Sequence, residues 1–256
     1  MKVSVLQPDL AWEDKSLNFS RLENLILPLY GKTDLIILPE LFSTGFTMNT
    51  DLLAEEPEKE TYNWMRDVAK RSNAGICGSY IIKEEDNYYN RFVFVEPAGN
   101  CSVYDKRHLF SPGEENLHFF PGNNRLIFNF KGFRIAPYIC YDLRFPVWSR
   151  NKNDTDLIIY VANWPSSRKN AWNILLKARA IENQCFVAAS NRIGTDGMGL
   201  HYSGDSVIID PRGEVIAAAD NGPEQSVTAD LSLNELNKFR NKFPVFKDSD
   251  SFTINP

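Results

Sequence analysis

Short apolar runs typical of β-strands recur along the whole chain and clearly outnumber its helical segments. About a dozen runs are rich in β-branched and aromatic residues, whereas only four or five segments show helical periodicity. The runs are Val3–Gln7, Leu35–Leu38, Gly75–Ile82, Tyr88–Val95, Leu126–Phe130, Phe133–Ile139, Leu157–Val161, Phe186–Ser190, Ser206–Asp210, Glu214–Ala218 and Ser226–Ala229. A single doubly wound sheet needs nearly one helix for each crossover. The ratio therefore predicts an α/β fold with two mixed sheets packed face to face, a four-layer α-β-β-α sandwich.

The helical segments are spread between the strands. They are expected around Leu22–Leu29, after Pro57, over Asn170–Asn183 and from Ser232, where Glu235 would complete a capping box. We find no linker, composition shift or short repeat, so residues 1–256 are expected to form a single domain. The polar residues from about 244 to 256 are expected to form an extended tail.

Charge and hydropathy exclude several classes of partner. The 256 residues carry a net charge of -5, from 28 basic and 33 acidic side chains, without a basic run that would attract nucleic acid. No apolar run approaches the roughly 18–20 residues of a membrane helix, so no membrane partner is expected. The N-terminal segment MKVSVLQPDL lacks the apolar core of a signal peptide. A cytoplasmic protein is therefore expected.

The cysteines and histidines show no metal-binding or disulfide pattern. No C-x-x-C, H-x-x-H or H-E-x-x-H spacing occurs, so neither a zinc site nor a disulfide framework is expected. We interpret three of the four cysteines as inert core residues: Cys77, Cys101 and Cys185. Of the three histidines, His108, His118 and His201, His108 is expected to be structural.

Glu40 lies in the first of three chemically suggestive segments, LIILPELFSTGF. A buried strand over Leu35–Leu38 ends at Pro39 and would place Glu40 at its carboxyl end, where catalytic groups of α/β folds commonly lie. Its apolar neighbours would remove part of its solvent and make the carboxylate a better general base. The alternative is a solvated acid at a strand end.

Lys106 lies in the second segment, SVYDKRHLFSPGEEN. It follows a short strand and precedes the apolar pair Leu109 and Phe110, so it could place a fixed positive charge in a pocket. The alternative is an exposed surface lysine, which is more common for any lone Lys.

Cys140 lies in the third segment, FRIAPYICYDLRFP. The apolar strand Phe133–Ile139 runs into Cys140, after which the chain becomes polar, a layout that exposes a nucleophile on a sharp turn. A helix starting just after Cys140 would favour its thiolate. Asp142 and Arg144 are interpreted as scaffold of the turn, and the alternative for Cys140 is an inert core cysteine.

In this order, the three segments resemble the nitrilase or carbon–nitrogen hydrolase superfamily, and the similarity extends from VSVLQPD to SGDSVIIDPRGEV. The resemblance implies the sandwich fold, a Glu40–Lys106–Cys140 triad and a second, substrate-orienting acid soon after the lysine. We assign that acid to Glu114, with the adjacent Glu115 as the alternative. No metal or organic cofactor is required by such a site.

Within the superfamily, the chain resembles the omega-amidase branch in ELFSTGF, YDKRHLF, CYDLRFP, YVANWP and LKARAIENQ. This implies hydrolysis of the ω-amides of 2-oxo dicarboxylic acids, 2-oxoglutaramate and 2-oxosuccinamate, through a Cys140 thioester. A nitrilase, a carbamoyl-amide hydrolase or a short aliphatic amidase could use the same triad. A papain-type protease with Cys140 and a histidine, and a catalytically silent binding protein, are alternatives of other classes.

Several residues are expected to bind the substrate. The backbone N–H of Tyr141 would join Lys106 in stabilising an oxyanion, while Trp164 and the phenylalanines Phe42 and Phe46 would wall the pocket. Arg168 would bind a substrate carboxylate through its planar fork. A solvated Arg168 is the alternative, and Arg144 is the competing ligand.

The resemblance also implies a homodimer or a higher even oligomer. The expected contact lies near Ala171–Asn183 and the segment after Cys140. Trp148 and the tail after Phe243 are further candidates for contact with the partner.

Overall fold

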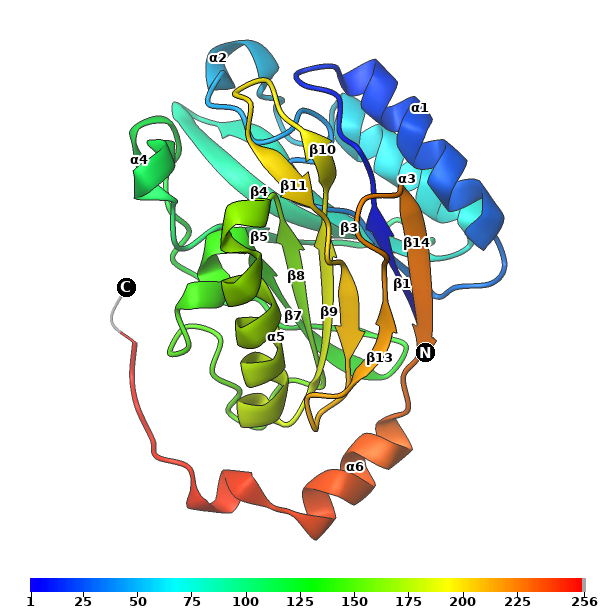
Figure 1. Ribbon diagram of the computed structural model, residues 1–256, viewed down its shortest axis with the longest axis vertical. Helices are drawn as coiled ribbons and strands as arrows, with labels where there is room; N and C mark the ends of the chain where they lie inside the picture. The colour runs from blue at the N-terminus through cyan, green and yellow to red at the C-terminus, as the bar shows by residue number, and fades with distance from the viewer. Residues whose placement is uncertain (255–256) are drawn as a thin grey trace.

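Two six-stranded sheets form the centre of the computed structural model, which describes residues 1–254 (Figure 1). The first sheet has the order β14 (Gln225–Asp230), β1 (Lys2–Gln7), β2 (Leu35–Ile37), β3 (Gly75–Glu84), β4 (Asn87–Val95) and β5 (Cys101–Asp105). The second has the order β13 (Val215–Ala218), β12 (Val207–Ile209), β9 (Phe186–Asn191), β8 (Leu157–Ala162), β7 (Phe133–Ile139) and β6 (Phe128–Phe130). Both have parallel central strands, β1–β2–β3 and β7–β8–β9, with antiparallel strands outside them.

Alternating residues of the strands build two apolar layers. Val3 and Val5 of β1 face the second sheet in one core, whereas Leu6 joins a separate core beneath the helices. The helices α1 (Lys15–Ile26) and α3 (Glu60–Ser72) cover the outer face of the first sheet, and α5 (Lys169–Asn183) covers the second (Figure 1). The predicted four-layer α-β-β-α sandwich is thus confirmed.

The shorter elements lie in the connections and towards the C-terminus. They are the helices α2 (Thr50–Leu53), α4 (Glu115–His118) and α6 (Leu233–Lys242), the 3-10 turns η1 (Leu27–Leu29), η2 (Ser111–Gly113), η3 (Cys140–Arg144), η4 (Ser166–Arg168) and η5 (Val245–Asp248), and the strands β10 (Ile193–Thr195) and β11 (His201–Ser203). β10 and β11 pair as a separate hairpin that we did not predict, because three-residue strands carry little periodicity. None of the helices within residues 1–254 has both the length and the apolar character needed to cross a bilayer.

The C-terminal segment departs from the prediction in two respects. The Ser232 hydroxyl accepts the N–H of Glu235, but the Glu235 carboxylate pairs with Lys238 at 2.7 Å, so that the capping box is only half formed. After η5 the tail lies against its own chain, where Lys152 donates to the carbonyl of Phe252 and Ile254 packs on the core. The tail is therefore partly folded; positions 255–256 lie outside the described residues.

Candidate active site

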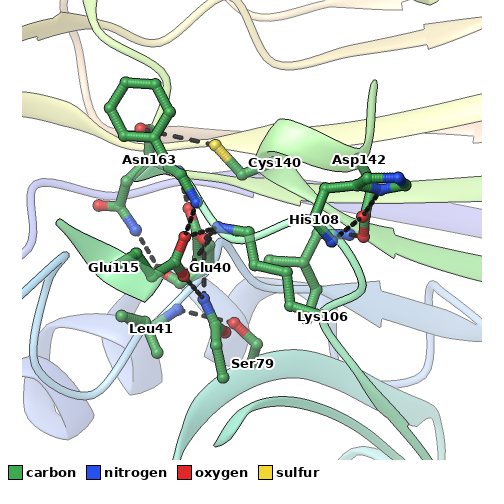
Figure 2. A network of polar contacts seen from close by, with 12 residues as sticks. Glu40, Leu41, Ser79, Lys106, His108, Glu115, Cys140, Asp142 and Asn163 are labelled. Atoms are coloured by element: carbon green, nitrogen blue, oxygen red, sulfur yellow. Dashed lines mark hydrogen bonds and ion pairs between the residues drawn. The ribbon is translucent and has the colours of Figure 1, made fainter. Parts of the chain in front are cut away.

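Four strands bring the polar side chains of the site together. Glu40 lies three residues beyond β2, and Lys106, Cys140 and Asn163 directly follow β5, β7 and β8. β2, β7 and β8 belong to the parallel parts of their sheets, and residues that follow such strands gather at the carboxyl edge. Figure 2 shows the resulting cluster, with the Cys140 sulfur beside Asn163.

Lys106 lies between two carboxylates at the centre of the cluster. Its Nζ is 2.7 Å from Oε1 of Glu40 and 2.9 and 2.8 Å from Oε1 and Oε2 of Glu115 (Figure 2). All three side chains are fully buried. This burial contradicts the alternatives of a solvated acid at Glu40 and an exposed surface lysine at Lys106. Burial by itself lowers the pKa of Lys106, but attraction by Glu115 and Glu40 outweighs it and raises the pKa above its ordinary value.

The acid that contacts Lys106 is Glu115, so the prediction that Glu114 holds the lysine is wrong by one position. Glu114 has a left-handed backbone with φ of 60°, and this turns the following residue inward at the start of α4. Glu115 is fully buried and also accepts the N–H of Phe110 at 2.6 Å. Burial raises the pKa of Glu115. Glu114 is exposed and lines the cavity instead.

Two asparagines that we did not predict hold the carboxylates in place. Nδ2 of Asn90, on β4, donates to Oε1 of Glu40 at 2.9 Å and to Oε1 of Glu115 at 3.1 Å. The backbone N–H of Asn163 donates to the other oxygen of Glu40 at 2.8 Å, and the Asn163 side chain binds the Glu40 carbonyl. The only signal in the sequence is that asparagine is uncommon within a strand such as β4.

Cys140 lies on a strained turn, with a left-handed φ of 43°. The chain continues in the short 3-10 turn η3 and not in the α-helix that we expected. Burial raises the pKa of the Cys140 thiol well above its ordinary value, the Glu40 carboxylate raises it further, and the opposing effect of Lys106 is smaller. These effects favour the protonated thiol, and the α-helix that we expected to favour the thiolate is absent.

Asp142 supports the turn from behind, in agreement with its interpretation as scaffold. Its carboxylate accepts the Tyr104 hydroxyl at 2.7 Å and the backbone N–H groups of Ile139 and His108 at 3.0 Å each. His108 also bonds Asp142 through its ring at 2.8 Å, so this histidine has a structural contact (Figure 2).

No histidine within residues 1–254 is hydrogen-bonded to Cys140, whose sulfur instead donates to the carbonyl of Asn163 at 3.8 Å. This geometry does not support the papain-type alternative. In the same residues, no group of three or more His, Cys, Asp or Glu side chains is arranged to hold a metal ion.

A cavity of about 710 Å³ opens over Cys140. Tyr141, Trp164, Arg168 and Phe46 line it, as predicted for substrate-binding residues. The unpredicted β10–β11 hairpin forms part of the wall through Met198, Leu200 and Tyr202, and Trp12 contributes after β1.

Two guanidinium groups face this cavity without a carboxylate partner in the described part of the chain. Arg168 lies 4.9 Å over the Phe110 ring, and Arg144 lies 5.0 Å over the Trp164 ring. We interpreted Arg144 as scaffold of the turn, but the structure places it in the wall of the same cavity as Arg168. The site is therefore suited to an anionic ligand.

Phe42 does not line the cavity, contrary to prediction. The left-handed φ of 43° at Leu41 turns Phe42 back into the core beneath the helices, where its ring lies 5.7 Å from Trp64 and 6.2 Å from Tyr80. Phe46 remains in the cavity, with its ring 5.4 Å from Nζ of Lys106.

This difference predicts opposite effects of two matched substitutions. Phe42→Ala should lower the free energy of unfolding by about 3–5 kcal/mol because it leaves a cavity in the core, while the folded enzyme keeps its kcat/KM. Phe46→Ala should cost about 1 kcal/mol or less and should reduce kcat/KM. Urea unfolding and steady-state kinetics measure the two effects, and equal destabilisation by both would contradict the assignment.

The remaining cysteines only partly follow the prediction of inert core residues. Cys77 and Cys185 are buried, and burial raises the pKa of both thiols above the ordinary value. Cys101 is exposed at the start of β5, so its assignment to the core is wrong. Cys101 lies on an outer strand of the first sheet, where alternate side chains face solvent.

The fold and the buried Glu–Lys–Cys cluster define a class of protein, and the chain belongs to the carbon–nitrogen hydrolase family, whose model matches residues 2–241. A solved CN-hydrolase superfamily protein of Xanthomonas campestris superposes with a TM-score of 0.97 at 44% identity, covering 100% of this chain and 99% of that one. Nit3 of Saccharomyces cerevisiae, a member of the nitrilase superfamily, shares the fold, with a TM-score of 0.84 at 24% identity over 96% of this chain and 94% of Nit3.

Two curated relatives match over nearly their whole length. Omega-amidase YafV of Escherichia coli (strain K12) is 46% identical over 254 residues, which are 99% of this chain and 98% of YafV. The 2-oxoglutaramate amidase of Bacillus subtilis (strain 168) is 35% identical over 252 residues, 96% of each chain. The resemblance to the nitrilase superfamily and its omega-amidase branch is thus confirmed.

Proposed function

We propose that this chain is an omega-amidase that hydrolyses the ω-amides of short 2-oxo dicarboxylic acids, 2-oxoglutaramate and 2-oxosuccinamate, to the acid and ammonia. The observation that carries the proposal is the buried Glu40–Lys106–Glu115 cluster beside Cys140, in a cavity that also holds two guanidinium groups without carboxylate partners. The names of the two curated relatives support the same substrate class.

Glu40 is the general base of the first step. The resting thiol has a raised pKa, so a base must take its proton as Sγ attacks the amide carbon. The carbonyl oxygen becomes an oxyanion, which Lys106 and the backbone N–H of Tyr141 stabilise. Glu115 holds the Lys106 ammonium in position through its two oxygens.

Glu40 then passes the proton to the leaving nitrogen, the carbon–nitrogen bond breaks, and ammonia departs. The acyl group remains on Cys140 as a thioester. Glu40 next removes a proton from a water molecule that attacks the thioester, and the proton returns to the sulfur as the acid leaves. The covalent intermediate replaces one difficult step with two easier ones.

Arg168 and Arg144 bind the substrate carboxylate in this proposal. Each presents a planar fork that suits a carboxylate, and neither is neutralised within the described residues. A site with an unpaired cation disfavours a neutral analogue because the cation stays unpaired when that analogue binds.

Arg168→Met should lower kcat/KM for 2-oxoglutaramate by about 100-fold, since a charged hydrogen-bonding pair is lost. Turnover of a neutral amide of equal length should change little. Arg144→Met tests the second ligand in the same way, and Arg212→Met, at an exposed arginine paired with Asp210, is the matched control. Equal losses on both substrates would contradict carboxylate binding by Arg168.

Ammonia release from a panel of amides, nitriles and carbamoyl compounds tests the reaction class. The 2-oxo acid amides should exceed neutral amides of equal length by orders of magnitude in kcat/KM. A preference for nitriles, carbamoyl compounds or neutral amides would favour the other carbon–nitrogen hydrolases that can use the same triad.

We also propose a homodimer that uses α5 and the segment after η3. Ile174 and Ile181 of α5 and Val147 expose 58%, 54% and 58% of their surfaces, an apolar face that a partner could cover. Trp148 does not contribute, contrary to prediction, because it is buried and donates to the Tyr104 hydroxyl of its own chain. Light scattering should give twice 29.3 kDa, and 29.3 kDa at micromolar protein would contradict the dimer.

A cytoplasmic location is the remaining proposal. The mechanism needs a reduced Cys140 thiol, all four cysteines are free, and the cytosol keeps thiols reduced. Recovery of the activity outside the cytosolic fraction of disrupted cells would contradict this location.

A further inference from the structure

Asn90 and Lys106 bridge the same pair of carboxylate oxygens. Nδ2 of Asn90 donates to Oε1 of Glu40 at 2.9 Å and to Oε1 of Glu115 at 3.1 Å. Nζ of Lys106 contacts these two atoms at 2.7 and 2.9 Å. Both side chains are fully buried, so no solvent takes the place of either donor.

Asn90 also binds the backbone of the lysine. The Lys106 N–H donates to the Asn90 carbonyl at 3.0 Å, just beyond the antiparallel pairing of Arg91 with Asp105. Asn90 is not among the residues that line the cavity. Any effect it has on the reaction must therefore pass through Glu40, Glu115 and Lys106.

The orientation of the Asn90 amide follows from its partners. Two carboxylate oxygens require donors, so the nitrogen must face them and Oδ1 must point away. Oδ1 is buried without a hydrogen-bond partner in the described structure. An unpaired buried acceptor is destabilising. The Asn90 amide therefore lowers the stability of the fold through Oδ1 while its nitrogen binds the two carboxylates.

The hydrogen bonds of the Lys106 ammonium group indicate what the Asn90 amide does. An ammonium group has three N–H donors, and the three contacts of Nζ, including Oε2 of Glu115 at 2.8 Å, direct all of them at carboxylates. Lys106 must therefore turn one N–H away from a carboxylate to reach an oxyanion. The bond to Oε1 of Glu40 or to Oε1 of Glu115 can be released without leaving that oxygen unpaired, because Asn90 still donates to both atoms.

We propose that Asn90 is a positioning residue that keeps a donor on Glu40 and Glu115 while Lys106 turns one N–H to the oxyanion, an inference that rests on the proposed amidase mechanism. Without Asn90, release of either Oε1 atom leaves a buried charged oxygen without a donor, whereas Oε2 of Glu115 keeps the Phe110 N–H. The two carboxylates also repel each other more strongly, which favours their protonated forms.

Two substitutions of similar shape test the role. Asn90→Leu removes both donors and should lower kcat by about 10- to 100-fold with KM nearly unchanged. It should also move the acidic limb of the kcat/KM profile upward by about one pH unit. Asn90→Asp should lose more activity at neutral pH and recover part of it at lower pH, where the protonated side chain again supplies one donor.

A matched control separates this role from loss of a buried asparagine. Asn183, at the end of α5, is fully buried and bonded to Ser149 and Asn151. Asn183→Leu should lower stability but leave the pH profile of the folded enzyme in place. If Asn90→Leu does not fold, the pH-dependent recovery of Asn90→Asp decides the question.

Alkylation of Cys140 by iodoacetamide gives a readout without a substrate. Peptide mass spectrometry must follow it, since Cys101 is exposed and reacts as well. The pH dependence of the rate should move upward in Asn90→Leu and not in Asn183→Leu. An unchanged kcat and unchanged limb in folded Asn90→Leu, an equal shift in both variants, or no low-pH recovery in Asn90→Asp would overturn the proposal. A wild type that is alkylated but hydrolyses no amide would instead reject the proposed function.

Discussion

Cys140→Ala should abolish amide hydrolysis, by at least about 10,000-fold, while the protein keeps its fold. Cys140 is the cysteine that lines the cavity, and its sulfur is the atom on which the thioester would form. Alanine tolerates the φ of 43° at this position about as poorly as cysteine does, so the substitution adds little backbone strain. Ammonia release measures the loss, and circular dichroism checks the fold.

Intact-protein mass spectrometry with a slowly hydrolysed amide provides a direct test of the same assignment. The wild type should carry an acyl adduct that the Cys140→Ala variant lacks. Cys101→Ala is the matched control, because Cys101 is exposed on β5, outside the cavity, and its loss should leave both adduct and turnover intact. Wild-type turnover in the Cys140→Ala protein would exclude Cys140 as the nucleophile.

Lys106→Met should impair both activity and stability. The rate should fall by about 100- to 1,000-fold, the usual effect of removing an oxyanion donor. The free energy of unfolding should fall by about 3–5 kcal/mol, since Glu40 and Glu115 would remain buried without their cation. Lys238→Met is the control, because that lysine forms an exposed pair with Glu235 that contributes little to stability.

A double variant distinguishes the two effects of Lys106. Adding Glu115→Gln to Lys106→Met removes one of the two buried negative charges, so stability should partly return while activity should not.

A second double variant tests whether Glu40 and Lys106 act together. Adding Glu40→Gln to Lys106→Met should reduce the rate far less than the product of the two single losses, because residues that act as a unit give non-additive effects. Fully multiplied losses would contradict a shared role of Glu40 and Lys106.

The sequence was sufficient to predict the architecture and, together with the resemblance to the family, the grouping of Glu40, Lys106 and Cys140. The many strand-like runs and few helices require two sheets, since each additional parallel crossover would need another helix. Each of the three residues comes shortly after a strand-like run. Residues that follow parallel strands gather at the carboxyl edge of a sheet, which applies to Glu40 and Cys140. Lys106 follows the antiparallel strand β5, and its place beside them was implied by the resemblance to the family.

Single backbone dihedrals determined which of two nearby side chains enters the site, and the spacing of residues in the sequence could not predict this. The left-handed φ at Glu114 makes Glu115 the buried acid, and the left-handed φ at Leu41 sends Phe42 into the core, while Phe46 remains in the cavity. Neither Glu nor Leu favours this conformation on its own, so tertiary contacts must impose it. No pattern in the sequence reveals such a reversal.

The ionisation of the site residues and the contacts that hold them in place also depended on the tertiary structure. The raised pKa of Cys140 comes from burial and from Glu40, which lies a hundred residues earlier in the chain. Asn90 and Arg144 acquire their places only when β4 packs beside the acids and η3 turns into the cavity. Sequence determines which chemical groups are present and which strand carries each of them. Their protonation and hydrogen-bond partners are properties of the folded neighbourhood, because burial and charges from distant segments act on them together.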